Sequence, residues 1–409
     1  MTLERVSVIE SCRPCPVCHA HAGRRLHTMH FALPDDSPLP TQYHLLVCLH
    51  CGIGYADSAA TADAYDRYYR HFSRYEDTAV ATGGGDDPVD RQRIENTAEF
   101  LSAQVQLSAR VLDVGCGNGG LLAALRRRGF TDLTGLDPAA ACIARIKAEG
   151  FAAVHASLPL CDPATLRDSS GSFDLIVMSH VLEHAFDAHR ALDSLLPLLV
   201  PGGHLYIETP DASRYCMDGF PPLYFFDPEH INHFDEESLK YLGRTLGLLP
   251  IAGGEKSLAL SNGQYYPAAF VLFRSSHASA LPSSPVARLY PLLLAYVKES
   301  LEDLLPLRDR LFSLVGDDES LALWGAGSLA QRLLSEPWFP VRRLLAIVDR
   351  DRNKQGLRFA GLTIETPEMG LRQLPERSVV LCAAAIAGKT IEQDYRQLGL
   401  SFPFHVIKS

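Results

Sequence analysis

Between residues 91 and 275, apolar and polar positions follow two alternating patterns. Short apolar runs, typical of buried strands, are separated by longer stretches in which apolar residues recur at helical spacing. Repeated strand–helix units of this kind predict an α/β fold, with a parallel sheet covered by helices on both faces. The last part of the segment predicts a hairpin that turns at Asn262-Gly263. The predicted strands cover residues 109–114, 133–138, 151–156, 173–179 and 202–210, and the hairpin covers 256–274.

The last third of the chain repeats the pattern on a smaller scale. A stretch rich in serine and proline, 275–285, precedes a helical pattern at 289–305, which we interpret as a helix that packs between domains. A strand, a glycine turn and a helix follow at 320–334, and the next strand ends on Asp349. The pattern predicts a smaller Rossmann-like α/β domain at 286–409. Its glycine turn could hold a dinucleotide, or it could be a packing turn without a ligand.

The first 75 residues contain two Cys-x-x-Cys pairs separated by 29 residues. Each pair can present two sulfurs on a tight turn, and four thiolates at this spacing suit a tetrahedral zinc ion. Cys12 forms a third such pair with Cys15, but Pro16 stiffens the turn that begins at Cys15. The alternative is a group of reduced, buried thiols. We expect a zinc-binding module at residues 1–75 with four ligands: Cys15, Cys18, Cys48 and Cys51.

Composition limits the class of protein and its partners. The chain has 409 residues, which predicts two or three domains, and its 47% hydrophobic and 21% charged residues are typical of a globular protein. We expect a cytoplasmic protein, since no apolar run reaches the ~18 residues of a membrane span and the first residues lack a signal-peptide pattern. A net charge of −10 disfavours nucleic acid and anionic membranes as partners. Residues 83–90 are acidic and glycine-rich, which suggests a linker or lid.

A glycine turn directly after the first strand is the clearest chemical signal. Asp113 precedes three glycines at every second position, and Asp137 ends the next strand, where its carboxylate could accept hydrogen bonds from two ribose hydroxyls. This "DVGCGNG" stretch resembles the cofactor turn of class I S-adenosylmethionine-dependent methyltransferases, which implies such a domain at 76–275. The resemblance also implies cofactor contacts from the ends of the third and fourth strands. The expected cofactor residues are Asp113, Gly115, Gly117, Gly119, Asp137, Ser157, Ser179 and His180.

The three segments in this order resemble the sugar C-methyltransferases of deoxysugar biosynthesis. The motifs are "CPVC…CLHCG", "VLDVGCGNG", "HVLEH", "EHINHF" and "WGAG…VD", and they span nearly the whole chain. The resemblance implies methylation of a carbon beside the keto group of a nucleotide-linked 4-keto sugar, with S-adenosylhomocysteine as the second product. It also places His184, Glu229 and His230 in the active site. That family commonly has Tyr-x-Glu-His in the last motif, whereas this chain begins it with Asp227.

The chemistry of methyl transfer assigns these residues different roles. A carbon or hydroxyl acceptor must lose a proton to a base, and a ketone-activated carbon also needs donors for the developing enolate. We predict His230 as the general base and His184 as a polar donor to the substrate. Glu229 either orients His230 or contacts the hydroxyls of a sugar. An O-methyltransferase would use the same base, and an inactive scaffold protein is a third possibility. We expect Glu208 and Asp211 to form turns. Tyr68, Tyr69 and Tyr75 could cover the cofactor, but we expect them to pack as aromatic side chains.

Overall fold

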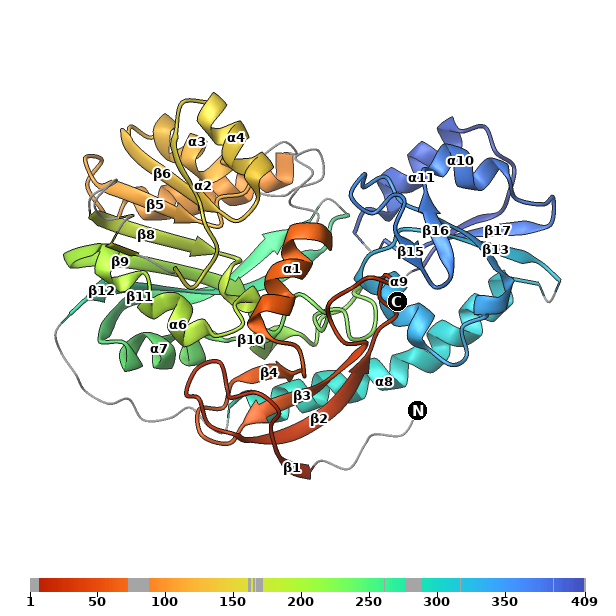
Figure 1. The fold of residues 1–409 in the computed structure, drawn as a ribbon, viewed down its shortest axis with the longest axis horizontal. Helices are drawn as coiled ribbons and strands as arrows, with labels where there is room; N and C mark the ends of the chain where they lie inside the picture. The colour runs from red at the N-terminus through yellow and green to blue at the C-terminus, as the bar shows by residue number, and fades with distance from the viewer. Residues whose placement is uncertain are drawn as a thin grey trace.

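The computed structural model contains three β-sheets, joined by helices (Figure 1). It describes residues 7–72, 88–160, 163–164, 166, 172–260, 262–276, 288–316, 318–384 and 386–407. The predicted boundary at 75/76 and Tyr75 lie outside these residues, as do most of the acidic stretch 83–90 and of the serine-rich stretch 275–285. Within the described part of the chain, no helix is both long enough and apolar enough to cross a membrane.

The N-terminal sheet is antiparallel and has five strands in the order β1-β2-β3-β4-β10. Its fifth strand comes from the middle of the chain, where Asn232 pairs with Tyr55 and His233 with Gly54. The "EHINHF" stretch is therefore fixed to the edge of this sheet. The elements are β1 (Ser7–Glu10), β2 (Ala22–His30), β3 (Gln42–Cys48), β4 (Gly54–Asp57), β10 (Asn232–His233) and the helix α1 (Ala62–Phe72) that follows β4.

The central sheet has seven strands in the order β11-β12-β9-β8-β5-β6-β7. The five strands from β9 to β7 are parallel, and β12 and β11 add the predicted hairpin in antiparallel pairing. The hairpin's first strand starts at Leu248, eight residues earlier than predicted. The strands are β5 (Arg110–Val114), β6 (Asp132–Asp137), β7 (Ala152–His155), β8 (Phe173–Ser179), β9 (Leu199–Pro210), β11 (Leu248–Ala259) and β12 (Tyr265–Ser275).

Helices cover both faces of the central sheet, as the strand–helix pattern predicted (Figure 1). Successive residues of β8 point to opposite faces, so that Leu175 and Val177 pack with α2, α3 and α4 while Ile176 and Met178 pack with α6 and α7. This alternation buries the strand on both sides. The helices are α2 (Pro88–Ser102), α3 (Gly120–Arg127), α4 (Ala140–Ala148), α6 (Ala188–Asp193) and α7 (Glu236–Thr245), with short 3₁₀ turns η2 (Leu182–His184), η3 (Leu196–Leu198) and η4 (Ala212–Arg214).

The C-terminal sheet has the order β15-β16-β14-β13-β17-β18 and is parallel except for the β15–β16 pair. Its strand–turn–helix start matches the predicted second α/β unit. The elements are β13 (Ser320–Trp324), α9 (Ser328–Ser335), η5 (Val341–Arg343), β14 (Leu344–Val348), β15 (Arg358–Phe359), β16 (Leu362–Glu365), α10 (Pro367–Arg372), β17 (Ser378–Cys382), α11 (Gly388–Gln397) and β18 (Phe404–Val406).

A single long helix, α8 (Leu289–Leu314), connects the central sheet to the C-terminal sheet and passes along the N-terminal sheet (Figure 1). Its buried positions include Leu293, Tyr296 and Leu304, which share one apolar core with Leu45 of β3 and Leu321 of β13. The segment 215–231, which contains the predicted base His230, contributes aromatic side chains to the same core. The candidate base therefore lies on a segment that is packed against elements from both ends of the chain.

Candidate functional site

The glycine turn after β5 can be formed only by residues with little bulk. Gly115 has a φ of 70° and Gly119 a φ of 79°, and both are in the left-handed region that favours glycine. A Cβ atom on Gly115 would lie 2.4 Å from a methyl carbon of Val181, which belongs to the "HVLEH" segment after β8. The turn and that segment are thus in direct contact, at the carboxyl ends of neighbouring parallel strands. This is the edge of the sheet where ligands bind in folds of this type.

Asp113 and Asp137 are buried beside this turn. Asp137 accepts hydrogen bonds from the backbone N–H of Gly117 and of Ala139, both at 2.8 Å, so its carboxylate holds the turn to the end of β6. Burial, and secondarily the charge of Asp137, raise the pKa of Asp113 to about 8. A cationic ligand beside this pair would favour the ionised form of Asp113. Ser157, the expected contact after β7, is exposed at the same edge.

The end of β8 carries a network of buried charges. Ser179 donates a hydrogen bond to Glu208, and His180 lies with its two ring nitrogens 3.3 Å from Glu183 Oε1 and 3.4 Å from Glu208 Oε1. Burial lowers the pKa of His180, but these two carboxylates outweigh it and raise the pKa to about 9. Lys256 approaches the other oxygen of Glu208 to 2.5 Å. The turn-forming role predicted for Glu208 is therefore wrong, because this carboxylate lies on β9 and balances two cations.

The stretch that contains Glu229 and His230 is organised by the side chain of Asp227. Its Oδ1 accepts hydrogen bonds from the backbone N–H of Glu229 at 2.8 Å and of His230 at 2.7 Å. Burial raises the pKa of Asp227. The charge of His230 and the two N–H groups lower it by more, so the pKa lies below its ordinary value. The carboxylate at this position therefore shapes the turn that presents His230, a role that the tyrosine of the resembling family could not fill.

Elements from both ends of the chain hold the same stretch. The Tyr43 hydroxyl of β3 donates to the Asp227 carbonyl at 3.3 Å. Arg332 of α9 is 6% exposed, and its Nη1 donates to the carbonyls of three residues that precede Asp227. These carbonyls belong to Leu223, Tyr224 and Phe226, at 2.9, 3.3 and 3.0 Å. The C-terminal unit thus contacts the candidate base loop directly.

His184 and His230 form a pair whose ring centroids are 4.8 Å apart. His184 Nδ1 lies 2.8 Å from the Tyr69 hydroxyl and 3.1 Å from the Glu229 carbonyl, and Tyr69 itself donates to that carbonyl. A carbonyl can only accept, so all three contacts are satisfied when Nδ1 carries the proton and Nε2 has the lone pair. Burial, followed by His230, lowers the pKa of His184 to about 4. The predicted role of His184 as a donor to substrate does not fit this tautomer, because the N–H is used within the protein.

Two short segments bring this pair together. The backbone N–H of Ile231 donates to the Glu183 carbonyl at 3.0 Å, and the Asn232 side chain donates to the Leu182 and Ala185 carbonyls. The predicted catalytic residues His184, Glu229 and His230 are therefore neighbours, although 45 residues separate the first two in the chain. Glu183 completes the group, since its carboxylate and the ring nitrogens of His184 and His230 all lie within 4.8 Å of one another.

Comparison with known proteins decides the class of the central segment. Residues 89–251 match the model of a methyltransferase domain family. The chain contains an S-adenosylmethionine-dependent methyltransferase domain. The chain is 33% identical over 159 residues to a protein named ubiquinone biosynthesis O-methyltransferase from Xylella fastidiosa, and 34% identical over 147 residues to one of the same name from Xanthomonas euvesicatoria. These alignments cover 36% and 34% of this chain and 64% and 60% of the relatives, so the chain spans less than two thirds of their length.

Solved methyltransferase structures align with this chain at low scores. The 1,6-didemethyltoxoflavin-N1-methyltransferase of Burkholderia thailandensis gives a TM-score of 0.40 at 18% identity, covering 56% of this chain and 97% of that one. The magnesium protoporphyrin IX methyltransferase of Synechocystis gives 0.37 at 16% identity, covering 53% and 97%. The family match and the sequence relatives therefore carry the assignment of the domain.

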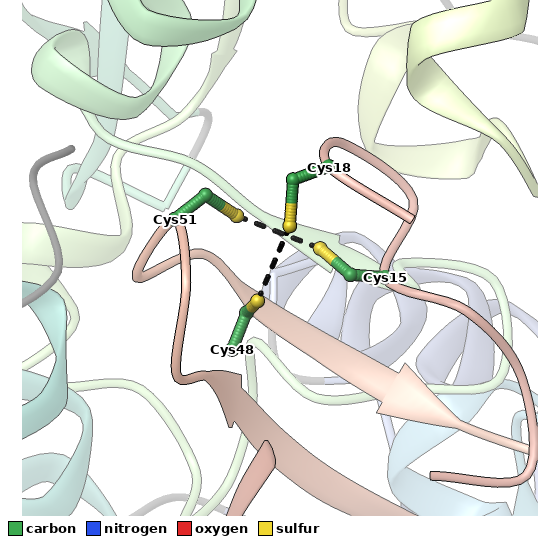
Figure 2. Close-up of side chains that lie close together, drawn as sticks. All are labelled: Cys15, Cys18, Cys48 and Cys51. Carbon is green, nitrogen blue, oxygen red and sulfur yellow. Dashed lines mark hydrogen bonds between the residues drawn. The ribbon is translucent and has the colours of Figure 1, made fainter. Parts of the chain in front are cut away.

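Outside the methyltransferase domain, the four predicted cysteines form one cluster (Figure 2). Sγ of Cys15 is 3.5 Å from Sγ of Cys51, and Sγ of Cys18 is 3.5 Å from Sγ of Cys48. The backbone N–H of His50 also points at Cys48 Sγ, at 3.4 Å, a contact that stabilises a thiolate. Cys12 is exposed and apart from the cluster, in agreement with the choice of Cys15. The geometry and the donor set are compatible with a tetrahedral zinc ion.

Sequence reasoning missed three parts of the site. We expected Tyr69 to have a packing role, but its hydroxyl contacts His184 Nδ1 and donates to the Glu229 carbonyl. Tyr68 likewise donates to a carboxylate oxygen of Glu229 at 3.3 Å. Glu183 lies inside the "HVLEH" motif but was given no role, and Arg332 lay too far along the chain to be connected with the base loop. The sequence signals were that motif for Glu183 and, for Tyr68 and Tyr69, a group of tyrosines just before the domain.

Proposed function

We propose that this protein transfers the methyl group of S-adenosylmethionine to a hydroxyl oxygen of a small-molecule acceptor. The observation that carries the proposal is the His184–His230 pair, whose first member lies in the segment that contacts the glycine turn through Val181. Tyr69 contacts His184 directly, and Arg332 holds the segment that leads to His230. Two imidazoles at this distance, one of them with its N–H fixed on the protein, provide a nitrogen lone pair for the acceptor proton. The expected cofactor residues, from Asp113 to His180, lie at the same edge of the sheet.

The reaction needs one proton transfer and one displacement. His230 takes the acceptor's O–H proton as general base, and the oxygen forms a bond to the methyl carbon while the S–CH₃ bond breaks. The electron pair of that bond goes to sulfur, which changes from a sulfonium to the neutral thioether of S-adenosylhomocysteine. Holding the oxygen in line with the S–CH₃ bond supplies much of the acceleration. Glu229, beside His230 and Tyr68, is placed to orient the acceptor.

The acceptor is an oxygen rather than a carbon in this proposal for two reasons. Carbon methylation needs donors for an enolate, and the tyrosine that could serve is replaced by Asp227, whose carboxylate is used in the turn. The relatives that match the domain are named O-methyltransferases. Methylation of a nucleotide-linked 4-keto sugar at carbon remains the second candidate. It is supported by the hydrogen bonds from Arg332 of the C-terminal unit to the segment that leads to His230.

The two candidates separate in one experiment. The purified protein is incubated in deuterated water with S-adenosylmethionine carrying a ¹³C-methyl group, and with either catechols and sugars or nucleotide 4-keto sugars. Oxygen methylation gives a methyl carbon far downfield of any C-methyl signal and no exchange of acceptor C–H. Acceptor-dependent C–H exchange with a C-methyl product overturns the oxygen proposal in favour of carbon. Calorimetry that shows no binding of S-adenosylmethionine overturns both, and leaves a protein that binds partners without catalysis.

The cysteine cluster completes the proposal as a structural zinc site. Cys15, Cys18, Cys48 and Cys51 use all four positions of a tetrahedral ion, so no position is left for a substrate. The cluster packs against Tyr55 and Leu46 in an apolar core, which isolates it from the histidine pair. We therefore assign zinc to the folding of the N-terminal sheet, whose edge carries the end of the "EHINHF" stretch.

A further inference from the structure

We infer that Glu183, His184 and His230 form a second metal site, which binds a divalent first-row transition metal ion within the proposed acceptor site. This inference rests on the proposed function for the role of the ion, although binding of the ion can be measured without it. The three side chains offer one carboxylate oxygen and two imidazole nitrogens, a donor set that suits iron, zinc, cobalt or nickel. It is distinct from the four-cysteine cluster, which lies in the N-terminal sheet.

The spacing of the donor atoms supports a common ion. The oxygen and the two nitrogens all lie within 4.8 Å of one another. Three donors at ~2.1 Å from one ion are themselves roughly 3 to 4 Å apart, so closure needs inward shifts of less than about 1 Å. Glu183 and His184 are adjacent in the 3₁₀ turn η2, and the hydrogen bond from Ile231 to the Glu183 carbonyl holds the third ligand's segment against them.

The surroundings of His184 are those of a metal ligand. Ligating histidines usually give their second ring N–H to a carbonyl or another acceptor, which fixes the tautomer and aims the free nitrogen at the ion. His184 Nδ1 has two such neighbours, the Glu229 carbonyl at 3.1 Å and the Tyr69 hydroxyl at 2.8 Å. His230 is oriented through its backbone, because its N–H is bound by Asp227 at 2.7 Å. The ring of His184 and the main chain of His230 are therefore fixed before any ligand arrives.

The carboxylate of Glu183 gives an independent indication. The Glu183 side chain is 1% exposed, and its Oε1 lies 3.3 Å from His180 Nδ1. Its Oε2 is buried and has no hydrogen-bond partner among the described residues. A buried carboxylate oxygen without a partner is costly, and a cation is the natural partner for it. His180 is shared with Glu208, and Lys256 contacts Glu208 rather than Glu183.

An ion held by three protein ligands has further coordination positions that no side chain fills. The groups that can bind there determine the class of acceptor. Two adjacent oxygens, as in a catechol, a vicinal diol or an α-hydroxyketone, can bind to neighbouring open positions. A hydroxyl bound to the ion loses its proton more easily than a free one, which makes the oxygen a nucleophile near neutral pH. The proton passes to the Glu229 carboxylate and then to water, and the oxygen displaces the methyl group from sulfur as above. In the metal-bound form His230 acts as a ligand rather than as the base.

Cobalt binding to the zinc-loaded full-length protein tests the site. Thiolates retain zinc, so added Co²⁺ reports on the second site through weak visible bands, without the intense sulfur-to-cobalt bands of a cysteine site. We expect one Co²⁺ per chain, and a loss of affinity of tenfold or more in Glu183→Gln and in His184→Ala. His204→Ala, which removes a histidine of β9 outside this cluster, is the matched control and should bind as the wild type does. One zinc per chain in every variant shows that the fold is intact.

The outcomes separate this inference from the proposed function. The metal site is overturned if the protein binds no Co²⁺ beyond the zinc site. It is also overturned if the wild type, Glu183→Gln and His204→Ala bind Co²⁺ equally. Methylation of a hydroxyl by the same samples would still support the proposed function. Stoichiometric Co²⁺ that depends on Glu183 supports the metal site, even where no hydroxyl acceptor is methylated and the proposed function fails. Stronger Co²⁺ binding in the presence of a catechol than of a monohydroxyl phenol supports the two-oxygen acceptor; equal binding overturns that part.

Discussion

Replacing Asp227 tests whether the candidate base is positioned by its own turn. In Asp227→Ala the backbone N–H groups of Glu229 and His230 lose their acceptor, which lies 2.8 and 2.7 Å away. In Asp227→Asn a neutral amide oxygen can still accept from both groups. The two variants therefore separate the geometry of the turn from its charge.

The size of the effect follows from the two bonds. A hydrogen bond to a charged group stabilises a fold by ~1.5–3 kcal/mol, and both bonds converge on one oxygen, so Asp227→Ala should lower the free energy of unfolding by about 3 kcal/mol. Asp227→Asn keeps the bonds without the charge and should lose roughly half of that. For the reaction, a displacement of His230 by ~1 Å can cost on the order of 100-fold in rate. We expect such a loss in kcat for Asp227→Ala and at most about tenfold for Asp227→Asn.

The assay compares three measurements on each variant. Urea unfolding followed by circular dichroism gives the stability, calorimetry gives the affinity for S-adenosylmethionine, and turnover of the methyl acceptor gives kcat. Affinity for the cofactor should be unchanged, because Asp227 lies outside the glycine turn. Equal kcat values for Asp227→Ala and the wild type, with the expected loss of stability, would refute the view that this turn presents His230 for catalysis.

Three further predictions follow from other contacts. Arg332→Met removes the donor to three carbonyls of the base loop and should lower kcat at least tenfold while calorimetry shows an unchanged affinity for S-adenosylmethionine; unchanged kcat would refute a positioning role. Cys18→Ser should release the zinc, reducing the metal measured after chelation by one ion per chain, and should destabilise the N-terminal sheet; retention of that ion would contradict the four-cysteine assignment. Burial raises the pKa of Asp113 to about 8, so unfolding releases its proton, and the wild type should lose on the order of 1 kcal/mol of stability per pH unit from about pH 5 to pH 8 relative to Asp113→Asn. Parallel stability curves for these two proteins across that range would contradict the raised pKa.

The features predicted correctly from sequence are those fixed by short stretches of chain. Cys15 and Cys18 are brought together by one local turn, and Cys48 and Cys51 by another. The glycine turn after β5 is equally local, because its residues need positive φ whatever surrounds them. The apolar strand β8 was predicted to the residue, since both of its faces are buried and its pattern is unbroken.

The parts that sequence could not give depend on contacts between distant residues. The tautomer of His184 is set by the Glu229 carbonyl, 45 residues later, and Tyr69, 115 residues earlier, contacts the same nitrogen. The base loop is held by Arg332, more than 100 residues later. Glu208 illustrates a different limit. A glutamate near a proline at the end of a strand suggests a turn, and only the positions of His180 and Lys256 show that its charge is needed inside.

Asp227 stands where the resembling family has a tyrosine, and the two side chains have different functions. Measured against Tyr-x-Glu-His, the aspartate is a missing catalytic group. In the fold it has a function of its own, because a short carboxylate can accept from the N–H groups two and three residues later, whereas a phenol is too long to do so. Placing a tyrosine at position 227 would therefore remove the turn, and the phenol would not by itself restore stabilisation of an enolate. Asp227→Tyr should therefore lose kcat as Asp227→Ala does, and a gain of acceptor C–H exchange in this variant would instead show that the phenol alone separates carbon from oxygen methylation.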